Sequence, residues 1–324
     1  MRAVRYHEGG EPGVLRIDEI DRPDPAADEV LVEVRAASIN PTDAKRRDRG
    51  TGPTPKTTGS DFAGVVSGIG DRVTGFEPGD RVCGTGLHTT RFHRGAAADY
   101  VAVPTDVVTH LPDGVSVEQG AAIALVGVTA WRGLLDHGGL EPTDRVLVHG
   151  GTGGVGHVAV QLASAMRANV VATAAPDRLD VTRDFGADAA VSYAADDLLA
   201  AVTDHAPNGF DVVLDHRAFE YFTLDLEAAA FGGTAVLYGG VEGTVELPRA
   251  ALVNNLAVQA MTMSNLSTRE STPTVASVLD RVLELAAAGH LEAAIARTYG
   301  FDEVDEAHRA VLEDSYVGKL VILP

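Results

Sequence analysis

The chain has 324 residues, of which 45% are hydrophobic, a formal net charge of -20 at pH 7 and one cysteine, Cys83. The hydrophobic content is enough for a substantial core and argues against disorder, and a single cysteine excludes an internal disulfide. Because the net negative charge repels a polyanion, we expect no nucleic-acid partner.

No stretch of the chain reaches the about 18 uninterrupted apolar residues that a membrane span needs. The first ten residues, "MRAVRYHEGG", lack the apolar core of a signal peptide. We therefore expect a soluble, cytoplasmic protein without membrane contact. The strong acidity and the small number of lysines indicate either a halophile-type surface, adapted to high internal salt, or a genomic bias.

The first third of the chain is rich in short β-branched runs bounded by turn residues. Residues 29–39, "EVLVEVRAASI", alternate between apolar and polar, and residues 61–84 carry glycine and proline at regular intervals. The tetrapeptide Gly-Asp-Arg-Val occurs twice there, as two signals for a turn that leads into a strand. Residues 1–120 are therefore predicted to form a β-rich, barrel-like domain.

From residue 121 the pattern changes to strands that alternate with helices. The strand-like runs include "RVLVHG", "NVVATA", "FDVVLD" and "GTAVLYGG", and helical runs such as "GHVAVQLASAM" lie between them. This alternation predicts a doubly wound parallel sheet wrapped by helices over residues 121–262. In residues 263–324, an amphipathic helix, "VASVLDRVLELAAAG", and a short strand, "GKLVILP", are predicted to complete the first domain.

A glycine-rich loop, "HGGTGGVGHV", joins the first of these strands to its helix. Gly151, Gly153 and Gly156 have the spacing Gly-x-Gly-x-x-Gly directly after the strand "RVLVH". Such a turn directs backbone N–H groups and the positive end of a helix at a pyrophosphate. The alternative is an ordinary tight connection with glycine for packing. The loop residues assigned to a dinucleotide are Gly151, Thr152, Gly153, Gly154, Val155 and Gly156.

A series of short segments along the chain resembles a known superfamily. These segments are "NPTDAK", "GSDFAGVV", "PGDRV", "ADYVAVP", "ALVGVTAWRGL", "VLVHGGTGGVG", "FGAD", "DVVLD" and "GKLVILP". They occur in the order seen in the medium-chain dehydrogenase/reductase superfamily. They look like its zinc-independent quinone oxidoreductase branch, the zeta-crystallin-like enzymes. The resemblance covers essentially the full chain. It implies a Rossmann domain inserted into a GroES-like catalytic domain, and a homodimer formed through the last strand of the nucleotide sheet, here "LAVQAMTM".

Zinc-dependent members of the superfamily have a cysteine where this chain has Asn40 and His-Glu where it has Ser60-Asp61. Neither Asn nor Ser is a good zinc ligand, and a catalytic zinc needs about three ligands of the Cys, His or carboxylate kind. Cys83, His88 and His93 are a rival set, but their spacing matches no standard metal motif and is also typical of a polar loop. We therefore predict an enzyme without zinc.

The resemblance places Asn40 near the nicotinamide, although Asn40-Pro41 is equally a turn signal in which Asn bonds its own backbone. Asp43 is expected to hold this loop rather than to react. Relatives often carry a tyrosine where this chain has Lys45, and this departure leaves the proton donor open. Lys45 either stabilises an enolate-like oxygen or is a solvated surface lysine.

Three further residues are assigned to the cofactor. Thr129, in "VGVTAW", matches a threonine near the nicotinamide of the family, and a threonine in a core helix is the alternative. Tyr193, in "VSY", matches a tyrosine at the adenosine end, and a partly buried aromatic at a strand end is the alternative. Tyr238 lies in "GTAVLYGG", a later strand-like run of the same predicted sheet.

The second strand of the nucleotide sheet, "NVVATA", has no acidic residue at its tip, where NAD-preferring sheets usually place one. Arg178 stands where relatives often have a phosphate-binding lysine, so we predict NADPH over NADH. There are two alternatives. If the turn is one residue shorter, Asp177 is the acidic residue that binds the ribose hydroxyls of NADH, and Arg178 is also consistent with an ordinary exposed residue at the start of a helix.

Without zinc to polarise a simple carbonyl, the small-molecule electron acceptor is expected to be conjugated, as a quinone or an α,β-unsaturated carbonyl is. One alternative is reduction of enoyl thioesters, which needs a basic patch for the CoA phosphate. A second is a non-catalytic NADPH-binding redox sensor.

Overall fold

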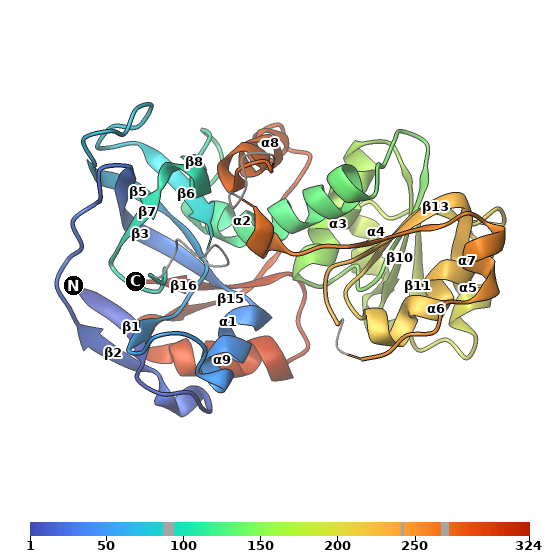
Figure 1. Cartoon of the computed structure of the whole chain (residues 1–324), viewed down its shortest axis with the longest axis horizontal. Coiled ribbons are helices and arrows are strands. Elements are labelled where there is room, and N and C mark those ends of the chain that lie inside the picture. Colours follow the sequence, from blue (N-terminus) through green and yellow to red (C-terminus); the bar gives the residue numbers. More distant parts are fainter. Residues whose placement is uncertain (87–93, 241–242, 267–271) are drawn as a thin grey trace. The chain divides into compact units, whose positions relative to one another are not determined.

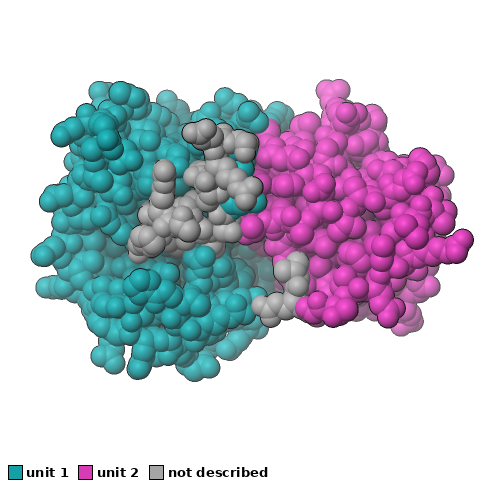
Figure 2. Space-filling view, in the orientation of Figure 1, with its two compact units in different colours: residues 1–128, 263–324 teal, residues 129–262 magenta. Residues whose placement is uncertain are grey.

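The computed structural model describes residues 1–86, 94–240, 243–266 and 272–324, and these form two compact units. Unit 1 contains residues 1–128 and 263–324, and unit 2 contains residues 129–262 (Figure 2). Unit 2 is thus one continuous segment inserted into a unit built from both ends of the chain. The predicted class, a parallel α/β sheet inserted into a β-rich domain, is confirmed.

Unit 1 is built on a seven-stranded sheet in which β15, β16, β3, β5, β6 and β8 follow one another and β7 also pairs with β3 (Figure 1). Its strands are β3 (Glu29–Ile39), β5 (Asp61–Ile69), β6 (Arg81–Thr85), β7 (Tyr100–Pro104), β8 (Val108–His110), β15 (Ile295–Gly300) and β16 (Lys319–Leu323). A three-stranded sheet contains β1 (Arg2–Tyr6), β2 (Arg16–Glu19) and β4 (Lys56–Thr57).

The strand β16 brings the end of the chain to its first third. It runs antiparallel to β3, with Leu320 opposite Ile39 and Val321 opposite Ser38. On the other side of β3, Ser38 lies opposite Asp61 of β5. This register gathers the ends of three strands at one place, where the polar cluster described below is found.

The helices of unit 1 are α1 (Pro41–Arg49), α2 (Val117–Trp131), α8 (Val275–Ala287) and α9 (Val304–Glu313). The helix α2 crosses the boundary between the units and continues as a π-helical segment, Arg132–His137. The predicted amphipathic helix is α8, and it begins where the Thr274 hydroxyl accepts a hydrogen bond from the Ser277 N–H group.

Unit 2 is a six-stranded sheet in the order β11-β10-β9-β12-β13-β14, and every neighbouring pair is parallel. Relative to chain order this is 3-2-1-4-5-6, the order of dinucleotide-binding folds. Its strands are β9 (Arg145–Val148), β10 (Asn169–Ala174), β11 (Ala189–Ser192), β12 (Phe210–Asp215), β13 (Ala229–Leu237) and β14 (Ala257–Ala260). Its helices are α3 (Gly154–Ala165), α4 (Leu179–Asp184), α5 (Leu198–Thr203), α6 (Ala218–Ala228) and α7 (Arg249–Val253).

The core of unit 2 follows the apolar pattern of the sequence. Every residue from Val146 to Val148 of β9 is buried, as expected for a strand covered on both faces. In α3, the buried face includes Val158, Ala159, Leu162 and Ala163. Within the described ranges, no helix is long and apolar enough to cross a membrane.

Candidate active site

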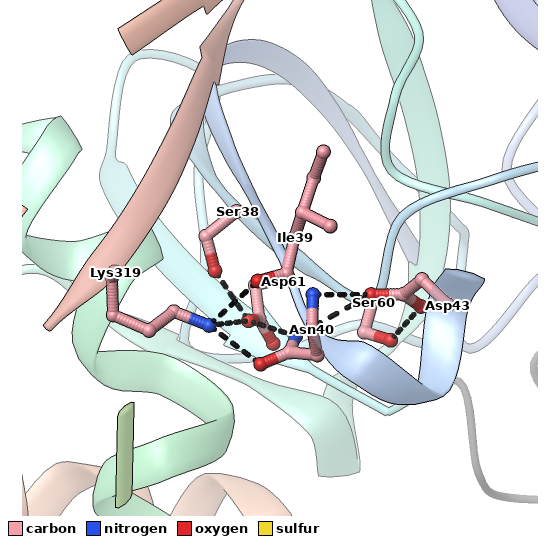
Figure 3. Close-up of polar contacts among 7 residues, drawn as sticks. All are labelled: Ser38, Ile39, Asn40, Asp43, Ser60, Asp61 and Lys319. Atoms are coloured by element: carbon pink, nitrogen blue, oxygen red, sulfur yellow. Dashed lines mark hydrogen bonds and ion pairs between the residues drawn. The ribbon is translucent and has the colours of Figure 1, made fainter. Parts of the chain in front are cut away.

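A cluster of buried polar side chains lies in unit 1 where β3 passes into α1 (Figure 3). The strand ends at Ile39, and Asn40 caps the helix with Pro41 in its first turn. The backbone N–H of Asn40 donates to Oδ2 of Asp43 over 2.9 Å. Asp43 thereby fixes the entry into α1.

The side-chain amide of Asn40 is held on both sides. Its Nδ2 donates to Oδ2 of Asp61 over 2.8 Å, and its Oδ1 accepts a hydrogen bond from Nζ of Lys319 over 2.5 Å. An ionised carboxylate only accepts and an ammonium only donates, so these two partners determine which end of the amide is nitrogen. Asn40 is 2% exposed, and its amide therefore has one defined orientation.

Lys319 is the cation of this cluster. Its Nζ donates to the backbone oxygen of Ile39 over 3.0 Å and lies 3.8 Å from Oδ2 of Asp61. Burial lowers the pKa of Lys319, while the nearby carboxylates of Asp61 and Asp43 oppose that shift. The acidic neighbours thus favour the ammonium form, against the effect of burial.

The two carboxyl groups of the cluster have different surroundings. Asp61 accepts hydrogen bonds from Ser38 Oγ over 2.6 Å and from Asn40, whereas Asp43 accepts one from Ser60 Oγ. Burial, reinforced by the charge of Asp61, raises the pKa of Asp43 to about 6, and the Ser60 hydrogen bond limits the rise. Asp43 therefore titrates closer to neutrality than an ordinary aspartate does.

The structure brings two of the three predicted catalytic residues together. Asn40 and Asp43 share the cluster, whereas Lys45 is exposed on α1 and takes no part in it. Sequence reasoning did not assign Asp61 or Lys319 to the site. The available signals were an aspartate that opens the apolar run "DFAGVV" and a lysine that opens the apolar strand "KLVIL".

No group of three or more His, Cys, Asp or Glu side chains suited to a metal occurs in the described part of the chain. Cys83 is buried in β6, and burial raises the pKa of its thiol, which disfavours the thiolate that a metal would require. His88 and His93, the other members of the rival set, lie outside the described residues.

In unit 2, the glycine loop begins after β9 and ends in the first turn of α3. Gly150 has a φ of +71°, in the left-handed region that favours glycine. A Cβ atom on Gly156 would lie 2.0 Å from the carbonyl oxygen of Gly150, and one on Gly151 would lie 2.8 Å from the Cβ of Ala172. Packing therefore requires glycine at both positions.

Gly153 is different, because an added Cβ would meet much less there than at Gly151 or Gly156. Among the described residues outside its own neighbourhood in the chain, the atom nearest an added Cβ would be the Gly150 carbonyl oxygen at 3.3 Å, a tight contact but not a clash, and the residue is exposed. Gly153 also precedes α3, whose start has no side-chain cap. The open backbone at Gly153 and the helix start suit the close approach of a pyrophosphate.

The other residues assigned to the cofactor lie mainly at the carboxyl ends of the parallel strands, the edge where ligands bind in such sheets. Arg178 is partly exposed in the turn after β10, and Tyr193 is 48% exposed just after β11. The Tyr193 N–H donates to the oxygen of Ala174 over 3.0 Å, which places it beside the tip of β10. Tyr238 directly follows β13.

The two assigned threonines are both buried. Thr152 lies in the glycine loop, and Thr129 lies in α2. A Rossmann sheet with this loop, inserted in a β-rich unit, defines a nicotinamide-dependent oxidoreductase.

Comparison with known proteins gives the same class. Residues 26–113 match the family described as "Alcohol dehydrogenase GroES-like domain", and residues 154–281 match the family described as "Zinc-binding dehydrogenase". The chain is 31% identical to the quinone oxidoreductase of Homo sapiens over 332 residues, which cover 100% of this chain and 98% of that protein.

Two solved structures cover 100% of this chain and are themselves covered fully. One, of an NAD-dependent alcohol dehydrogenase, is 30% identical with a TM-score of 0.89. The other, of a mycobacterial protein complexed with NADPH, is 26% identical with a TM-score of 0.86. The chain belongs to the medium-chain dehydrogenase/reductase superfamily, in its zeta-crystallin-like quinone oxidoreductase branch. It is an NAD(P)H-dependent oxidoreductase.

Proposed function

We propose that the chain is a zinc-independent reductase that uses NADPH to reduce a quinone or an α,β-unsaturated carbonyl compound. The cofactor supplies the hydride, and the protein supplies its position and the stabilisation of the negative charge that develops on the acceptor. In a conjugated acceptor this charge is delocalised onto oxygen, where hydrogen-bond donors or water suffice.

The observation that carries the proposal is the Lys319 ammonium inside the polar cluster. Zinc-dependent relatives are expected to place metal ligands where this chain has Asn40, Ser60 and Asp61. Here, all three side chains are hydrogen-bonded within the cluster, and the ammonium lies 2.5 Å from Asn40 Oδ1. A divalent cation at this point would be repelled by the ammonium and would meet only one carboxylate among these three side chains.

Within this proposal, Asn40 and Asp43 shape the backbone at the start of α1, beside the acceptor. Lys45 is exposed on the same helix, five residues beyond Asn40. We assign to its ammonium the stabilisation of the oxygen that gains negative charge, in place of the tyrosine of relatives.

The proposed preference for NADPH depends on Arg178. The tip of β10 is the small, uncharged Ala174, and Arg178 follows it after a short turn. A guanidinium at this position suits a 2′-phosphate, whereas a free ribose hydroxyl pair is usually bound by an acidic side chain.

We further propose a homodimer formed through β14. This strand ends the sheet of unit 2, and its residues Val258, Gln259 and Ala260 are exposed. Val258 on this edge is apolar and 40% exposed, and an exposed apolar strand at a sheet edge is a template for pairing with a second copy.

The test is the rate of NADPH oxidation against a panel of quinones, enones, enoyl thioesters and, in the reverse direction, simple alcohols. We expect turnover with quinones or enones, little oxidation of alcohols and no loss of activity after chelation. Stoichiometric zinc with activity lost on chelation would contradict the proposal. Turnover of enoyl thioesters alone would replace it with the thioester reductase, and tight NADPH binding without any turnover would replace it with the sensor.

A further inference from the structure

Behind the glycine loop, unit 2 holds a second group of buried polar side chains, which the proposed function does not use. His149, Asp215 and Asp225 are 0% exposed, and Thr173 is 1% exposed. His149 follows β9, Thr173 lies in β10, Asp215 ends β12 and Asp225 lies in α6. Four separate elements thus contribute to one group.

These side chains form a continuous series of hydrogen bonds that starts at the loop. The N–H of Gly150 donates to Oγ1 of Thr173 over 3.1 Å. The same hydroxyl lies 3.3 Å from Nδ1 of His149, whose Nε2 lies 2.9 Å from Oδ1 of Asp225. A backbone group of the cofactor loop is therefore linked to a buried carboxyl group.

The donor and the acceptor of each hydrogen bond in this series follow from the N–H and O–H groups that are available. Thr173 Oγ1 accepts from Gly150, and within the described residues the only acceptor near its own hydrogen is His149 Nδ1. The hydroxyl therefore donates to Nδ1, and His149 uses its Nε2–H to donate to Asp225. Burial lowers the pKa of His149 to about 4, so the imidazole is neutral near pH 7 and has one such hydrogen.

Asp215 is a further buried carboxyl group near the far end of the series. Burial, reinforced by the charge of Asp225, raises the pKa of Asp215 to about 7, and burial likewise raises the pKa of Asp225 to about 7. Whether Asp225 is ionised or protonated, its Oδ1 can accept the Nε2–H of His149.

Gly150 is the point at which this series acts on the loop. Its carbonyl oxygen accepts the N–H of Gly153 over 2.9 Å and faces Gly156 so closely that no Cβ would fit there. A shift of Gly150 therefore moves both Gly153 and the start of α3. Thr173 also accepts the Gly151 N–H at its backbone oxygen over 2.7 Å, a bond that does not depend on the threonine side chain.

We propose that Thr173, His149 and Asp225 are positioning residues of the cofactor site, which hold Gly150 so that the glycine loop is open to a pyrophosphate. This inference rests on nicotinamide cofactor binding at the loop, but not on the identity of the acceptor. None of the three residues needs to touch the cofactor, because they act through Gly150.

The test compares the dissociation constants of NADPH and NADH, measured by nicotinamide fluorescence, with the melting temperature of each variant. Thr173→Val keeps the shape and loses the hydroxyl, and it should weaken both cofactors by about 3- to 10-fold, the range expected for one hydrogen bond. Because both cofactors contain the pyrophosphate, their ratio of affinities should not change. Thr173→Ser should restore the wild-type affinity.

Thr58→Val is the matched control, because the Thr58 hydroxyl lies 3.2 Å from another buried histidine, His308, in unit 1. It should lower the melting temperature without changing either dissociation constant. A second pair probes the far end: Asp225→Asn keeps an acceptor for His149 and should bind both cofactors normally, whereas Asp225→Leu removes the acceptor and should weaken both.

Affinity of Thr173→Val within twofold of wild type, or no restoration by Thr173→Ser, overturns this inference alone. The same holds if Thr58→Val weakens the cofactors as much as Thr173→Val does. Failure of the wild-type chain to bind either cofactor overturns the proposed function and this inference together.

Discussion

The ammonium of Lys319 donates a hydrogen bond to the side-chain oxygen of Asn40, although the two residues are 279 positions apart in the chain. The contact exists because β16 pairs with β3, which ends one residue before Asn40. One strand from the end of the chain thus fixes the orientation of an amide that belongs to its first third.

Replacement of Lys319 by Met should destabilise the protein strongly. It leaves Asn40 Oδ1 without its donor and the buried carboxyl groups of Asp43 and Asp61 without their cation, and removal of one partner of a buried pair typically costs about 3–5 kcal/mol. The free energy of unfolding in urea measures this loss. Lys319→Arg should lose less because the charge remains, and Lys56→Met is the control for loss of a lysine elsewhere in unit 1. Equal stability of Lys319→Met and wild type would contradict this account of the cluster.

Replacement of Lys45 by Met tests the proposed donor to the acceptor oxygen. Since Lys45 is exposed, water replaces part of its effect, and we expect kcat to fall by about 10-fold, less than is usual for a buried donor. The dissociation constant of NADPH should not change. Arg49→Met, on the same helix, is the control. An unchanged kcat would identify Lys45 as a solvated surface residue.

Replacement of Arg178 by Ala should weaken NADPH and leave NADH almost unaffected. A charge-assisted hydrogen bond to phosphate contributes about 1.5–3 kcal/mol, which corresponds to roughly 10- to 150-fold in affinity. Arg183→Ala is a matched control, because Arg183 lies on the adjoining helix α4 and pairs with Asp180. Fluorescence titration with both cofactors distinguishes the outcomes. Equal weakening of NADPH and NADH, or a wild-type preference for NADH, would show that Arg178 does not bind the 2′-phosphate.

The buried His308 should make the protein less stable in mild acid. Burial, reinforced by the charge of Arg47, lowers its pKa to about 3, below the value of about 6.5 in the unfolded chain. The contribution of the neutral His308 side chain to the free energy of unfolding is complete above pH 6.5. It is lost as the pH falls towards 3, because over this range only the unfolded chain takes up the proton.

Between pH 7 and pH 5 this loss amounts to about 2 kcal/mol. His308→Gln should therefore lose about that much less stability than wild type over this interval, as measured by urea unfolding at both pH values. Asp43 acts in the opposite direction, because its pKa is raised and its contribution to stability is lost as the pH rises through about 6. This effect of Asp43 is the same in wild type and in His308→Gln, so it cancels in the comparison. Parallel pH profiles of variant and wild type would rule out this role of His308.

Replacement of Val258 by Lys should convert the proposed dimer to a monomer. A charged side chain on an edge strand opposes pairing with a second copy. Light scattering after size-exclusion chromatography measures the mass. Leu312→Lys is the control, because Leu312 is 41% exposed, close to the 40% of Val258, but lies on α9 of unit 1. A wild-type chain that elutes as a monomer would refute the dimer itself.

The sequence allowed the nucleotide-binding half to be predicted because its signals are local. The loop from Gly150 to Gly156 lies between a strand and a helix that are contiguous with it, so spacing alone identifies it. The pairing of Asn40 with Asp43 could also be inferred from the sequence, since the two residues are three positions apart and form one helix cap.

The partners of these residues were not predictable from local pattern. Lys319 reaches Asn40 only through the pairing of β16 with β3, and Asp225 reaches His149 from a helix 76 positions later. Such contacts depend on the register between distant strands and on the packing of a helix, which no short-range periodicity encodes. A lysine that begins an apolar strand and an aspartate within an apolar helix are the only traces of them in the sequence.

The position of Lys319 in β16 has a consequence for synthesis of the protein. A ribosome adds Asp43, Asp61 and the whole of unit 2 before it adds Lys319, the cation that interacts with these two carboxyl groups. A Rossmann unit that folds as it emerges, as domains generally do, would already be able to hold nucleotide on an unfinished chain. The polar cluster of unit 1, in contrast, can only close after β16 has been translated, so a chain terminated before Lys319 would lack this cluster.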